Sequence, residues 1–371
     1  MARLGDVCDI LDNKRVPITA SNRLAGPYPY YGANGVQDYV ADYIFDDELV
    51  LLAEDGGNFG SKDKPIAYRV SGKCWVNNHA HVLKPKEGLD VDYLCYSLMF
   101  YDVTGLVNGA TRQKLTQADM RKMEIPLPHL DEQRKIAAVL DKVSDLIAKR
   151  RQQLDKLDTL VKARFVEMFG DPERNTKGWP LLNISELCTV GSSKRIYQSE
   201  QAQEGIPFLR IADLTNLINT GTITAELYIP EMRYAELQAQ GQVPIKGDIL
   251  ITSRGTLGQC YIVKEDDRFY FQDGMISWLS KFVHDITPTY ISYLFTMPGF
   301  RKQIDSMQAG STVAYLSIAM IKKLKAMVPN MELQEKFADF VTQTNKSKLV
   351  VSQSLEKLGM LKKSLMQLYF G

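Results

Sequence analysis

The 371-residue sequence has few cysteines, no surplus of charge and no long apolar run. Its five cysteines include no C-x-x-C pair, which argues against a zinc site or a disulfide scaffold and indicates packing residues in a reducing compartment. The longest apolar stretches, such as residues 94–100, are far shorter than the roughly 20 residues that a membrane span needs. No secretory h-region is visible at the N-terminus, so we expect a soluble, cytoplasmic protein.

The charge balance is nearly even. The 45 Lys and Arg residues oppose 44 Asp and Glu residues, which gives a net charge of +1. This value neither identifies nor excludes a nucleic-acid partner. Because no segment is uniformly basic, any contact with DNA must come from local patches.

Catalytic signatures are also missing: there is no phosphate-binding loop, dinucleotide fingerprint, zinc-protease motif or nucleophile elbow. The only closely spaced histidines are His79 and His81, which on a strand would point to one face. One such pair falls short of three or four ligands, so we expect no metal site. Glu54 and Asp55, with Lys62, superficially resemble a nuclease cluster, but neighbours on an extended strand point to opposite faces. We therefore expect no catalytic residues and no catalysis by this chain alone.

The most informative feature is an internal repeat. Residues 131–170 match residues 332–371 at a constant offset of 201 without a gap, and residues 109–116 match 310–317 at the same offset. Further upstream the offset drifts, so the large segments share a scaffold but differ by insertions. The chain therefore divides into a variable, a fixed, a variable and a fixed segment, with the boundaries 1–128, 129–170, 171–329 and 330–371.

The fixed segments show the heptad spacing of coiled-coil helices. Asp131 follows two prolines and is the expected N-cap, and a helix over residues 131–168 would be about 57 Å long. Each helix could dimerise with another chain, but we favour an antiparallel pair within one chain that acts as a rigid spacer. Lys348 and Lys362 interrupt the second seam and must pair with acids or reach solvent. The predicted seam residues are Ile136, Leu140, Val143, Ile147, Leu154, Leu157, Val161, Phe337, Val341, Val351, Leu355, Leu358 and Leu365.

The variable segments mix short β-rich runs with helical stretches, so we predict two compact α/β domains and an α+β chain overall. Both place a glycine-containing turn, residues 55–60 and 253–258, directly after a buried strand. Such glycines either let the backbone approach a phosphate closely or supply the positive φ of a hairpin, and both interpretations stay open.

Several loops carry basic and amide side chains suited to DNA. Arg and Lys match guanine edges and phosphates, and Gln matches adenine. Each residue taken alone is more often an ordinary surface residue. The candidates for DNA contact are Lys14, Arg15, Lys62, Arg112, Gln113, Lys114, Lys194, Arg195, Arg210 and Arg254.

A junction precedes each helix, in residues 128–136 (PHLDEQRKI) and 329–337 (PNMELQEKF), and each follows a Gly-Ala-Thr or Gly-Ser-Thr triplet at 109 or 310. In this duplicated order the chain resembles the DNA-specificity subunit of type I restriction-modification systems. The resemblance implies two target recognition domains that read the halves of a bipartite DNA sequence, joined by an antiparallel coiled coil. Because the variable segments differ, the target should be asymmetric. At about 3.4 Å per base pair, the 57 Å helix corresponds to roughly 17 base pairs.

The resemblance also implies partners and cofactors. Two adenine methyltransferase subunits would dock on double-stranded DNA with this chain, and restriction subunits would join the full complex. S-adenosylmethionine, ATP and Mg2+ would bind those partners and not this chain. The second junction departs from the first, because Glu332-Leu-Gln334 replaces Asp131-Glu-Gln133. The alternatives are a cytoplasmic coiled-coil scaffold that joins two protein-binding domains, and, less favoured, a stand-alone nuclease.

Overall fold

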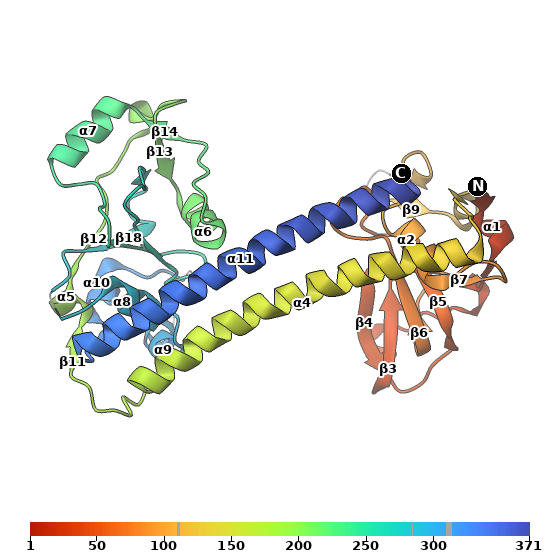
Figure 1. Cartoon of the computed structure of the whole chain (residues 1–371), viewed down its shortest axis with the longest axis horizontal. Coiled ribbons are helices and arrows are strands. Elements are labelled where there is room, and N and C mark those ends of the chain that lie inside the picture. Colours follow the sequence, from red (N-terminus) through yellow and green to blue (C-terminus); the bar gives the residue numbers. More distant parts are fainter. Residues whose placement is uncertain (110–111, 284, 309–313) are drawn as a thin grey trace. The chain divides into compact units, whose positions relative to one another are not determined.

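The computed structural model describes residues 1–109, 112–283, 285–308 and 314–371. They form two compact units: unit 1 contains residues 1–152 and 352–371, and unit 2 contains residues 153–351. Each unit combines one variable segment with parts of two long helices, α4 (Leu130–Phe169) and α11 (Met331–Phe370) (Figure 1). Residues 110–111, 284 and 309–313, which include His284, part of the first Gly-x-Thr triplet and all of the second, lie outside the described residues.

Unit 1 is built on a mixed six-stranded sheet in the order β2-β7-β5-β6-β3-β4. All neighbouring strands are antiparallel except β3 and β6. The central strand β5 ends in a run of five buried residues, 49–53, as its position between two neighbours requires. The strands are β2 (Cys8–Ile10), β3 (Ala25–Gly32), β4 (Gly35–Val40), β5 (Phe45–Ala53), β6 (Ala67–Val76) and β7 (Ala80–Pro85).

Helix α2 (Val91–Met99) packs on this sheet, and its first turn is capped by Asp90, whose side chain accepts the backbone N–H groups of Asp92 and Tyr93. The core contains residues of the sheet, of α2 and of the start of α4. The remaining elements of unit 1 are β1 (Ala2–Arg3), α1 (Leu4–Val7), η1 (Asp12–Lys14), η2 (Ala20–Asn22), β8 (Val107–Asn108), β9 (Lys114–Leu115), α3 (Gln117–Met120) and β10 (Glu124–Ile125).

Unit 2 repeats the first part of this topology. Its four-stranded sheet has the order β12-β18-β15-β16, which corresponds to β2-β7-β5-β6. A second, three-stranded sheet has the order β14-β13-β17. The strands are β11 (Leu181–Asn183), β12 (Thr189–Gly191), β13 (Ile206–Leu209), β14 (Tyr228–Ile229), β15 (Ile249–Thr252), β16 (Cys260–Ile262), β17 (Tyr270–Phe271), β18 (Ile276–Ser280) and β19 (Lys325–Met327).

The helices of unit 2 surround these sheets, and α8 is the counterpart of α2. Thr287 caps α8 by accepting the backbone N–H of Tyr290, as Asp90 caps α2. The helices are α5 (Ile184–Leu187), η3 (Gln198–Glu200), α6 (Ile211–Thr220), α7 (Glu231–Ala239), α8 (Pro288–Leu294), α9 (Pro298–Met307) and α10 (Ile318–Lys323). The short strands and helical stretches predicted for both variable segments are therefore present, and the α+β class is confirmed.

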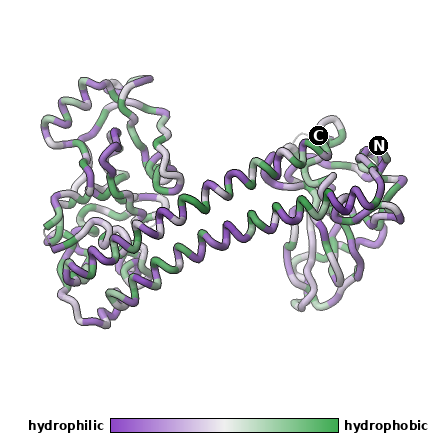
Figure 2. Tube along the Cα trace, viewed as in Figure 1, coloured by the Kyte–Doolittle hydropathy of each residue, from purple (hydrophilic) through white to green (hydrophobic). Residues whose placement is uncertain are grey.

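The two long helices run antiparallel in each unit. In unit 2, the ring of Phe165 contacts Phe337, and Lys348 forms an ion pair with Asp158. Moving backward along α4 thus corresponds to moving forward along α11. In unit 1, the start of α4 and the last turns of α11 join one core, which includes Ile136 and Leu365. These contacts confirm the predicted antiparallel coiled coil, and Figure 2 shows polar and apolar residues alternating along both helices.

The two lysines that interrupt the second seam, Lys348 and Lys362, each have a partner. Lys348 pairs with Asp158, as noted above, and Lys362 lies 5.8 Å from the centre of the Tyr96 ring. Burial lowers the pKa of Lys362, while the nearby Asp141 opposes this effect. The two lysines are therefore accommodated between the helices by an ion pair and a contact with an aromatic ring.

The junction before each long helix is anchored by a buried glutamine. In unit 1, Gln133 Oε1 accepts the Asp90 backbone N–H at 2.9 Å, and its Nε2 donates to the carbonyls of Gly88 and Pro128. This arrangement also corrects one expectation: α4 begins at Leu130, so Asp131 lies in its first turn and is not the N-cap. The exact first residue of a helix is the least predictable part of its sequence pattern.

All five cysteines are free thiols, and four are buried. Burial raises the pKa of Cys8, Cys74, Cys95 and Cys188 to about 12. These thiols are therefore unreactive packing residues, as expected. No helix of the described residues has the length and apolar character of a membrane span.

Candidate nucleic-acid interface

The turn after β5 separates two adjacent acids. Glu54, with 12% of its side chain exposed, pairs with Arg15, whereas Asp55, with 19% exposed, contacts His79. Glu54 is held by Arg15, whose Nη1 lies 2.6 Å from Glu54 Oε2, and by Lys114 Nζ at 2.9 Å from Oε1. The predicted divergence of the two carboxylates is therefore present. They do not form one nuclease-like cluster.

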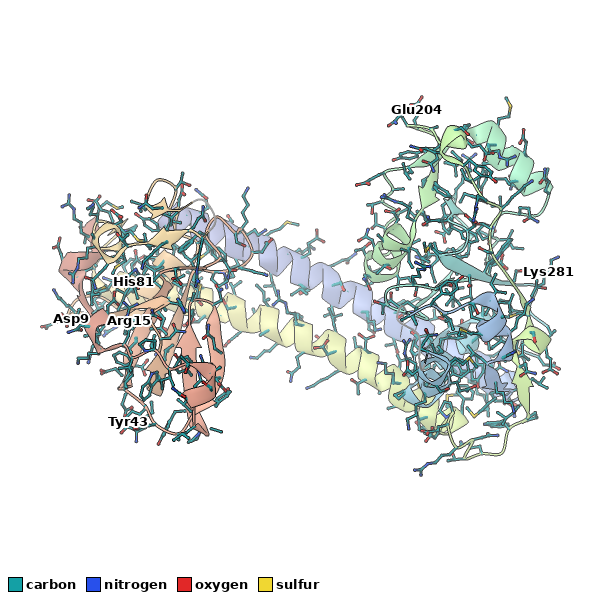
Figure 3. All side chains as sticks on the ribbon, turned by 180° about the vertical axis from the view of Figure 1, so that it is seen from behind. Asp9, Arg15, Tyr43, His81, Glu204 and Lys281 are labelled. Atoms are coloured by element: carbon teal, nitrogen blue, oxygen red, sulfur yellow. The ribbon has the colours of Figure 1, made fainter. Side chains whose placement is uncertain are left out.

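A buried polar network lies beneath this turn. Nδ1 of His81 is 2.6 Å from Asp12 Oδ2, and its Nε2 is 2.9 Å from the carbonyl of Leu115. Asp12 also accepts the Val82 backbone N–H and the Gln117 side-chain amide. Figure 3 labels His81 and Arg15, which lie close together in unit 1.

The two buried carboxylates are kept ionised by this network. Burial alone would raise the pKa of Asp12, but the hydrogen bond and charge of His81, with those of its amide donors, lower it below its usual value. For Glu54, burial also acts to raise the pKa, and the hydrogen bonds from Arg15 and Lys114 outweigh it. The network therefore fixes two negative charges inside unit 1 and surrounds them with cations.

Asp12, Glu54 and His81 place ligand atoms within 4.8 Å of one another, a spacing that could suit a metal ion. Arg15 and Lys114 already occupy both oxygens of Glu54, however, and both ring nitrogens of His81 have partners. A cation would compete with two positive side chains. We therefore interpret the cluster as an ion-pair network that braces the turn.

The two histidines do not act as a pair, which corrects the expectation that they share a face. His81 lies in β7 and is completely buried, whereas His79 precedes β7 and about a third of its side chain is exposed. Its Nδ1 lies 2.5 Å from Asp55 Oδ1. The chain bends before β7, so the alternation of an extended strand does not apply to His79.

On the outer side of the turn, Asp55 holds Arg112. Nη2 of Arg112 donates to Asp55 Oδ1 at 2.9 Å and lies 3.4 Å from His79 Nδ1. The Arg112 side chain is still 60% exposed. The remaining N–H groups of its guanidinium are thus available to a ligand at the surface.

Unit 2 carries a different set of side chains on the corresponding turn. Ser253 takes the place of Glu54, and its hydroxyl lies 2.8 Å from that of Ser277. The following residue, Arg254, is exposed, and its guanidinium carbon lies 5.3 Å from the centre of the Tyr315 ring. Among the residues that the structure describes, Arg254 forms no ion pair. The two turns therefore share a backbone position and differ in chemistry.

The other predicted contact residues are spread over both units. Lys14, Lys62, Gln113 and Lys194 are exposed. Arg195 pairs with Asp273 at 2.9 Å, and Arg210 pairs with Asp213 and Glu226. In unit 1, the structure brings Arg15, Arg112 and Lys114 together around residues 54–55. Only 12% of the Arg15 side chain is exposed, so its position suits bracing of the turn better than contact with DNA.

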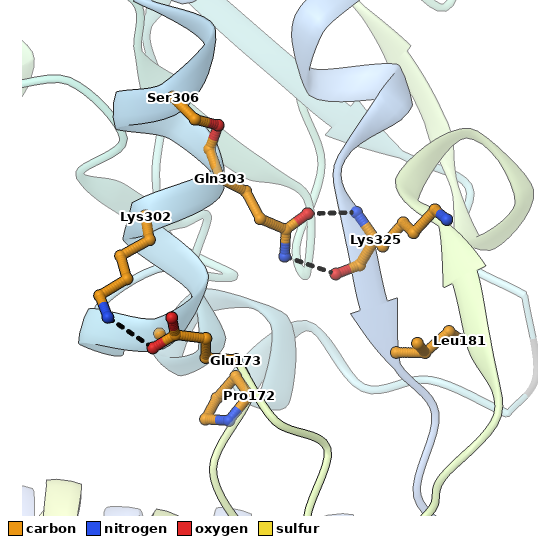
Figure 4. A pocket seen from close by; sticks show the side chains of 8 residues that line it. Pro172, Glu173, Leu181, Lys302, Gln303, Ser306 and Lys325 are labelled. Atoms are coloured by element: carbon orange, nitrogen blue, oxygen red, sulfur yellow. Dashed lines mark hydrogen bonds and ion pairs between the residues drawn. The ribbon is translucent and has the colours of Figure 1, made fainter.

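A shallow surface hollow in unit 2 lies between α9 and the chain that follows α4 (Figure 4). Lys302 pairs with Glu173 across it at 2.6 Å, and Gln303 exchanges two hydrogen bonds with the backbone of Lys325. A side chain at Gly299 would collide with the backbone of Glu173. Since the polar groups of the hollow bond one another, it serves to attach this chain segment to α9.

The sequence reasoning missed the buried network. Asp12 and Gln117 were not singled out, because they lie 105 residues apart and neither belongs to a motif. The available signal was the charge of Glu54 and His81 in or beside otherwise apolar strands, since buried charges in such places need partners.

Comparisons with known proteins agree on one family. The family model described as "Type I restriction modification DNA specificity domain" matches residues 1–158 and 176–358, so it matches twice and covers most of the chain. A Haemophilus influenzae protein named "Putative type I restriction enzyme specificity subunit S.HindORF215P" is 30% identical over 351 residues, which are 92% of this chain and 87% of that protein. The "Type I restriction enzyme MjaVIII specificity subunit" of Methanocaldococcus jannaschii is 23% identical over 403 residues, which cover 99% of this chain and 91% of that protein.

Solved structures show the same fold. The S subunit of a type I restriction-modification system from M. genitalium superposes with a TM-score of 0.61 at 16% identity, covering 100% of this chain and 95% of that one. A chain from a structure described as "Structural basis underlying complex assembly and conformational transition of the type I R-M system" gives a TM-score of 0.56 at 16% identity, covering 100% and 96%. At this identity the likeness concerns the fold alone.

Proposed function

Because the chain belongs to the type I restriction-modification DNA specificity family, we propose that it reads a bipartite, asymmetric DNA target and docks two adenine methyltransferase subunits. The family fixes the coarser statement, that the chain is a DNA-specificity subunit of such a system. The halves of the target, the gap between them and the partners are the content of the proposal.

The observation that carries the proposal is the contrast between scaffold and surface in the two repeats. Gln334 makes the same three contacts in unit 2 as Gln133 makes in unit 1, and the four-stranded sheet of unit 2 repeats the order of the first four strands of the sheet of unit 1. The exposed turns above those sheets carry different charged and aromatic groups. A shared scaffold with unlike surfaces suits two readers of different sequences, so each unit would read one half-site.

The paired helices supply the spacer in this proposal. Each helix has 40 residues, which corresponds to about 60 Å, or roughly 18 base pairs of DNA. Each also begins in one unit and ends in the other along the chain. The number of helical residues between the units would therefore set the length of the gap.

In the proposed complex this chain has no catalytic role. The methyltransferase subunits would carry S-adenosylmethionine, and the restriction subunits would use ATP and Mg2+. Gln133 and Gln334 are fully engaged within the chain, so methyltransferase docking would use other groups near the junctions, such as the exposed Asp131 and Glu332. The complex would act in the cytoplasm, where its DNA is.

Mapping adenine methylation in a host that expresses this chain together with methyltransferase subunits tests the proposal. We expect one asymmetric motif with two specified halves and a fixed gap, and we expect the motif to disappear when this chain is deleted. A methylation pattern that does not depend on the chain, together with binding of protein partners but not DNA, would favour the scaffold instead.

A further inference from the structure

The turns after β5 and β15 have equivalent backbones. Leu115 N–H donates to the carbonyl of Glu54 at 2.7 Å, and Leu316 N–H donates to that of Ser253 at 3.0 Å. The N–H of Glu54 bonds to the carbonyl that precedes β7, and the N–H of Ser253 bonds to the carbonyl that precedes β18, both at 2.9 Å. The glycines two residues further on, Gly56 and Gly255, have φ values of 62° and 67°. The bonds donated by the N–H groups of Glu54 and Ser253 therefore tie each turn to a neighbouring strand of the sheet.

The layer beneath the turn is held by hydrogen bonds in both units but differs in chemistry. In unit 1 it is the ion-pair network of Glu54, Arg15 and His81, which is completely buried at His81. In unit 2 it is the hydroxyl pair of Ser253 and Ser277, both buried. The hydroxyl pair of unit 2 is buried, and in unit 1 Lys114, which is half exposed, is held by Glu54. The side chains above these layers are therefore the ones best placed to contact a ligand.

The exposed layer follows no common plan, which distinguishes it from the scaffold. In unit 1, Asp55 and His79 flank Arg112. In unit 2, an arginine, Arg254, occupies the position of Asp55, and Tyr315 lies beneath it. These exposed side chains differ although the backbone hydrogen bonds of Glu54 and Ser253 are the same, so the shared scaffold does not dictate them.

We propose that Arg112 determines specificity by reading a guanine in the half-site of unit 1, and that Asp55 is the positioning residue that orients it. This inference rests on the proposed function. Guanine presents two acceptors, O6 and N7, in the major groove, and a guanidinium can donate to both at once. Asp55 holds one terminal nitrogen of Arg112 and leaves the other N–H groups exposed.

The Asp55 carboxylate both balances the charge of Arg112 and restricts the conformations of its side chain. When an unpaired arginine binds, its side chain loses rotational freedom about several bonds. An arginine that is already held by a carboxylate has lost part of this freedom before it binds. The Asp55 carboxylate is itself held by His79, whose Nδ1 lies 2.5 Å from Asp55 Oδ1. In unit 2, Arg254 lacks such a partner among the described residues, so the two half-sites should not share the same guanine contact.

The test uses this chain in complex with its methyltransferase subunits, and its probe is a library of DNA duplexes randomised in both half-sites. Bound duplexes are selected and sequenced for the wild type, Arg112→Lys, Asp55→Asn and the control Lys122→Gln. Lys122 is an exposed lysine of unit 1 that pairs with Asp119, away from the turn. Hydrogen exchange is measured for each variant to check that it is folded.

We expect Arg112→Lys to lower the preference for one guanine in one half-site about tenfold or more, because lysine keeps the charge but loses the fork. Asp55→Asn should relax the same position more weakly, and Lys122→Gln should change no position. Adding Asp55→Asn to Arg112→Lys should have little further effect, because the two residues act together.

Three results would overturn the inference. An unchanged motif for Arg112→Lys would remove its role and leave the proposed function intact. Relaxation at a different position in Asp55→Asn would remove the positioning role, and an equal effect in Lys122→Gln would show a general charge effect. If the wild-type complex selects no bipartite motif, the proposed function itself fails, and this outcome is visible before any variant is compared.

Discussion

Gln133 Oε1 accepts the backbone N–H of Asp90 at 2.9 Å, and this bond ties the first turn of α4 to the cap of α2. Gln334 repeats the bond at 2.8 Å with Thr287, the cap of α8. Both glutamines have no exposed surface, and both also donate to two carbonyls. The start of each long helix is therefore attached to its unit by the same set of buried glutamine hydrogen bonds.

Replacing these glutamines should loosen one unit at a time. Each alanine variant leaves buried backbone groups without partners, which we expect to cost about 2 to 3 kcal/mol of unfolding free energy. Hydrogen exchange should show the loss in unit 1 for Gln133→Ala and in unit 2 for Gln334→Ala. Gln152→Ala, at an exposed position of α4, is the control and should change little. Equal loss in both units for either buried variant would contradict the local role of these hydrogen bonds.

Breaking the helix pair should affect both half-sites together. Leu157 is half-buried on the seam of α4, and Leu157→Pro removes a helical hydrogen bond and costs about 3 kcal/mol or more. Binding to a full target should be lost, and methylation of both half-sites should fail. Leu157→Met keeps the volume and the helix, so it should retain binding. Unchanged binding by the proline variant would show that the seam is not needed.

The variable segments should be exchangeable. We expect a chain whose residues 1–128 are replaced by those of another family member to change one half of the methylated motif and keep the other half and the gap. Exchange of residues 171–329 should change the other half. A change in both halves from a single exchange would contradict the assignment of one half-site to each unit.

Acid should destabilise unit 1 through its buried carboxylates. The folded pKa values of Asp12 and Glu54 lie below the ordinary values of 3.8 and 4.5. Their contribution to stability is thus complete above those ordinary values and is lost as the pH falls through the lower folded ones. Hydrogen exchange of β5 and β7 between pH 6 and pH 3 measures this loss.

Two groups serve as controls for the acid effect. Asp12→Asn should flatten the pH dependence of unit 1, because one of its titrating carboxylates is gone. In unit 2, burial raises the pKa of Asp248, so its protonation at falling pH favours the fold and acts in the opposite direction. An Asp12→Asn variant with the same acid profile as the wild type would contradict the role of this network.

Much of the fold could be predicted from the sequence because it is periodic or repeated. Heptad spacing predicted both long helices, and the constant offset predicted that Gln133 and Gln334 would be equivalent. The N-cap of α4 was predicted two residues too late, at Asp131, although α4 begins at Leu130, since several residues before a helix satisfy the same local pattern.

The candidate site was less predictable, because its contacts join residues far apart in the sequence. Nothing in the spacing of Arg15, Glu54 and Lys114 shows that they meet, and only the folding of unit 1 brings them together. Arg15 and Arg112 looked alike as isolated basic residues, yet one is nearly buried and the other exposed. The difference depends on which acid lies beside each, and that is a property of the tertiary structure.

The most direct test of the whole account is the gap in the methylated motif after a heptad is inserted into each long helix, between residues 152 and 153 and between residues 351 and 352. Seven residues add about 10 Å while keeping the seam in phase, which corresponds to about three base pairs of DNA. We predict that both half-sites stay the same and that the gap lengthens by about three base pairs. An unchanged gap with both half-sites still recognised would contradict the spacer role of the helices.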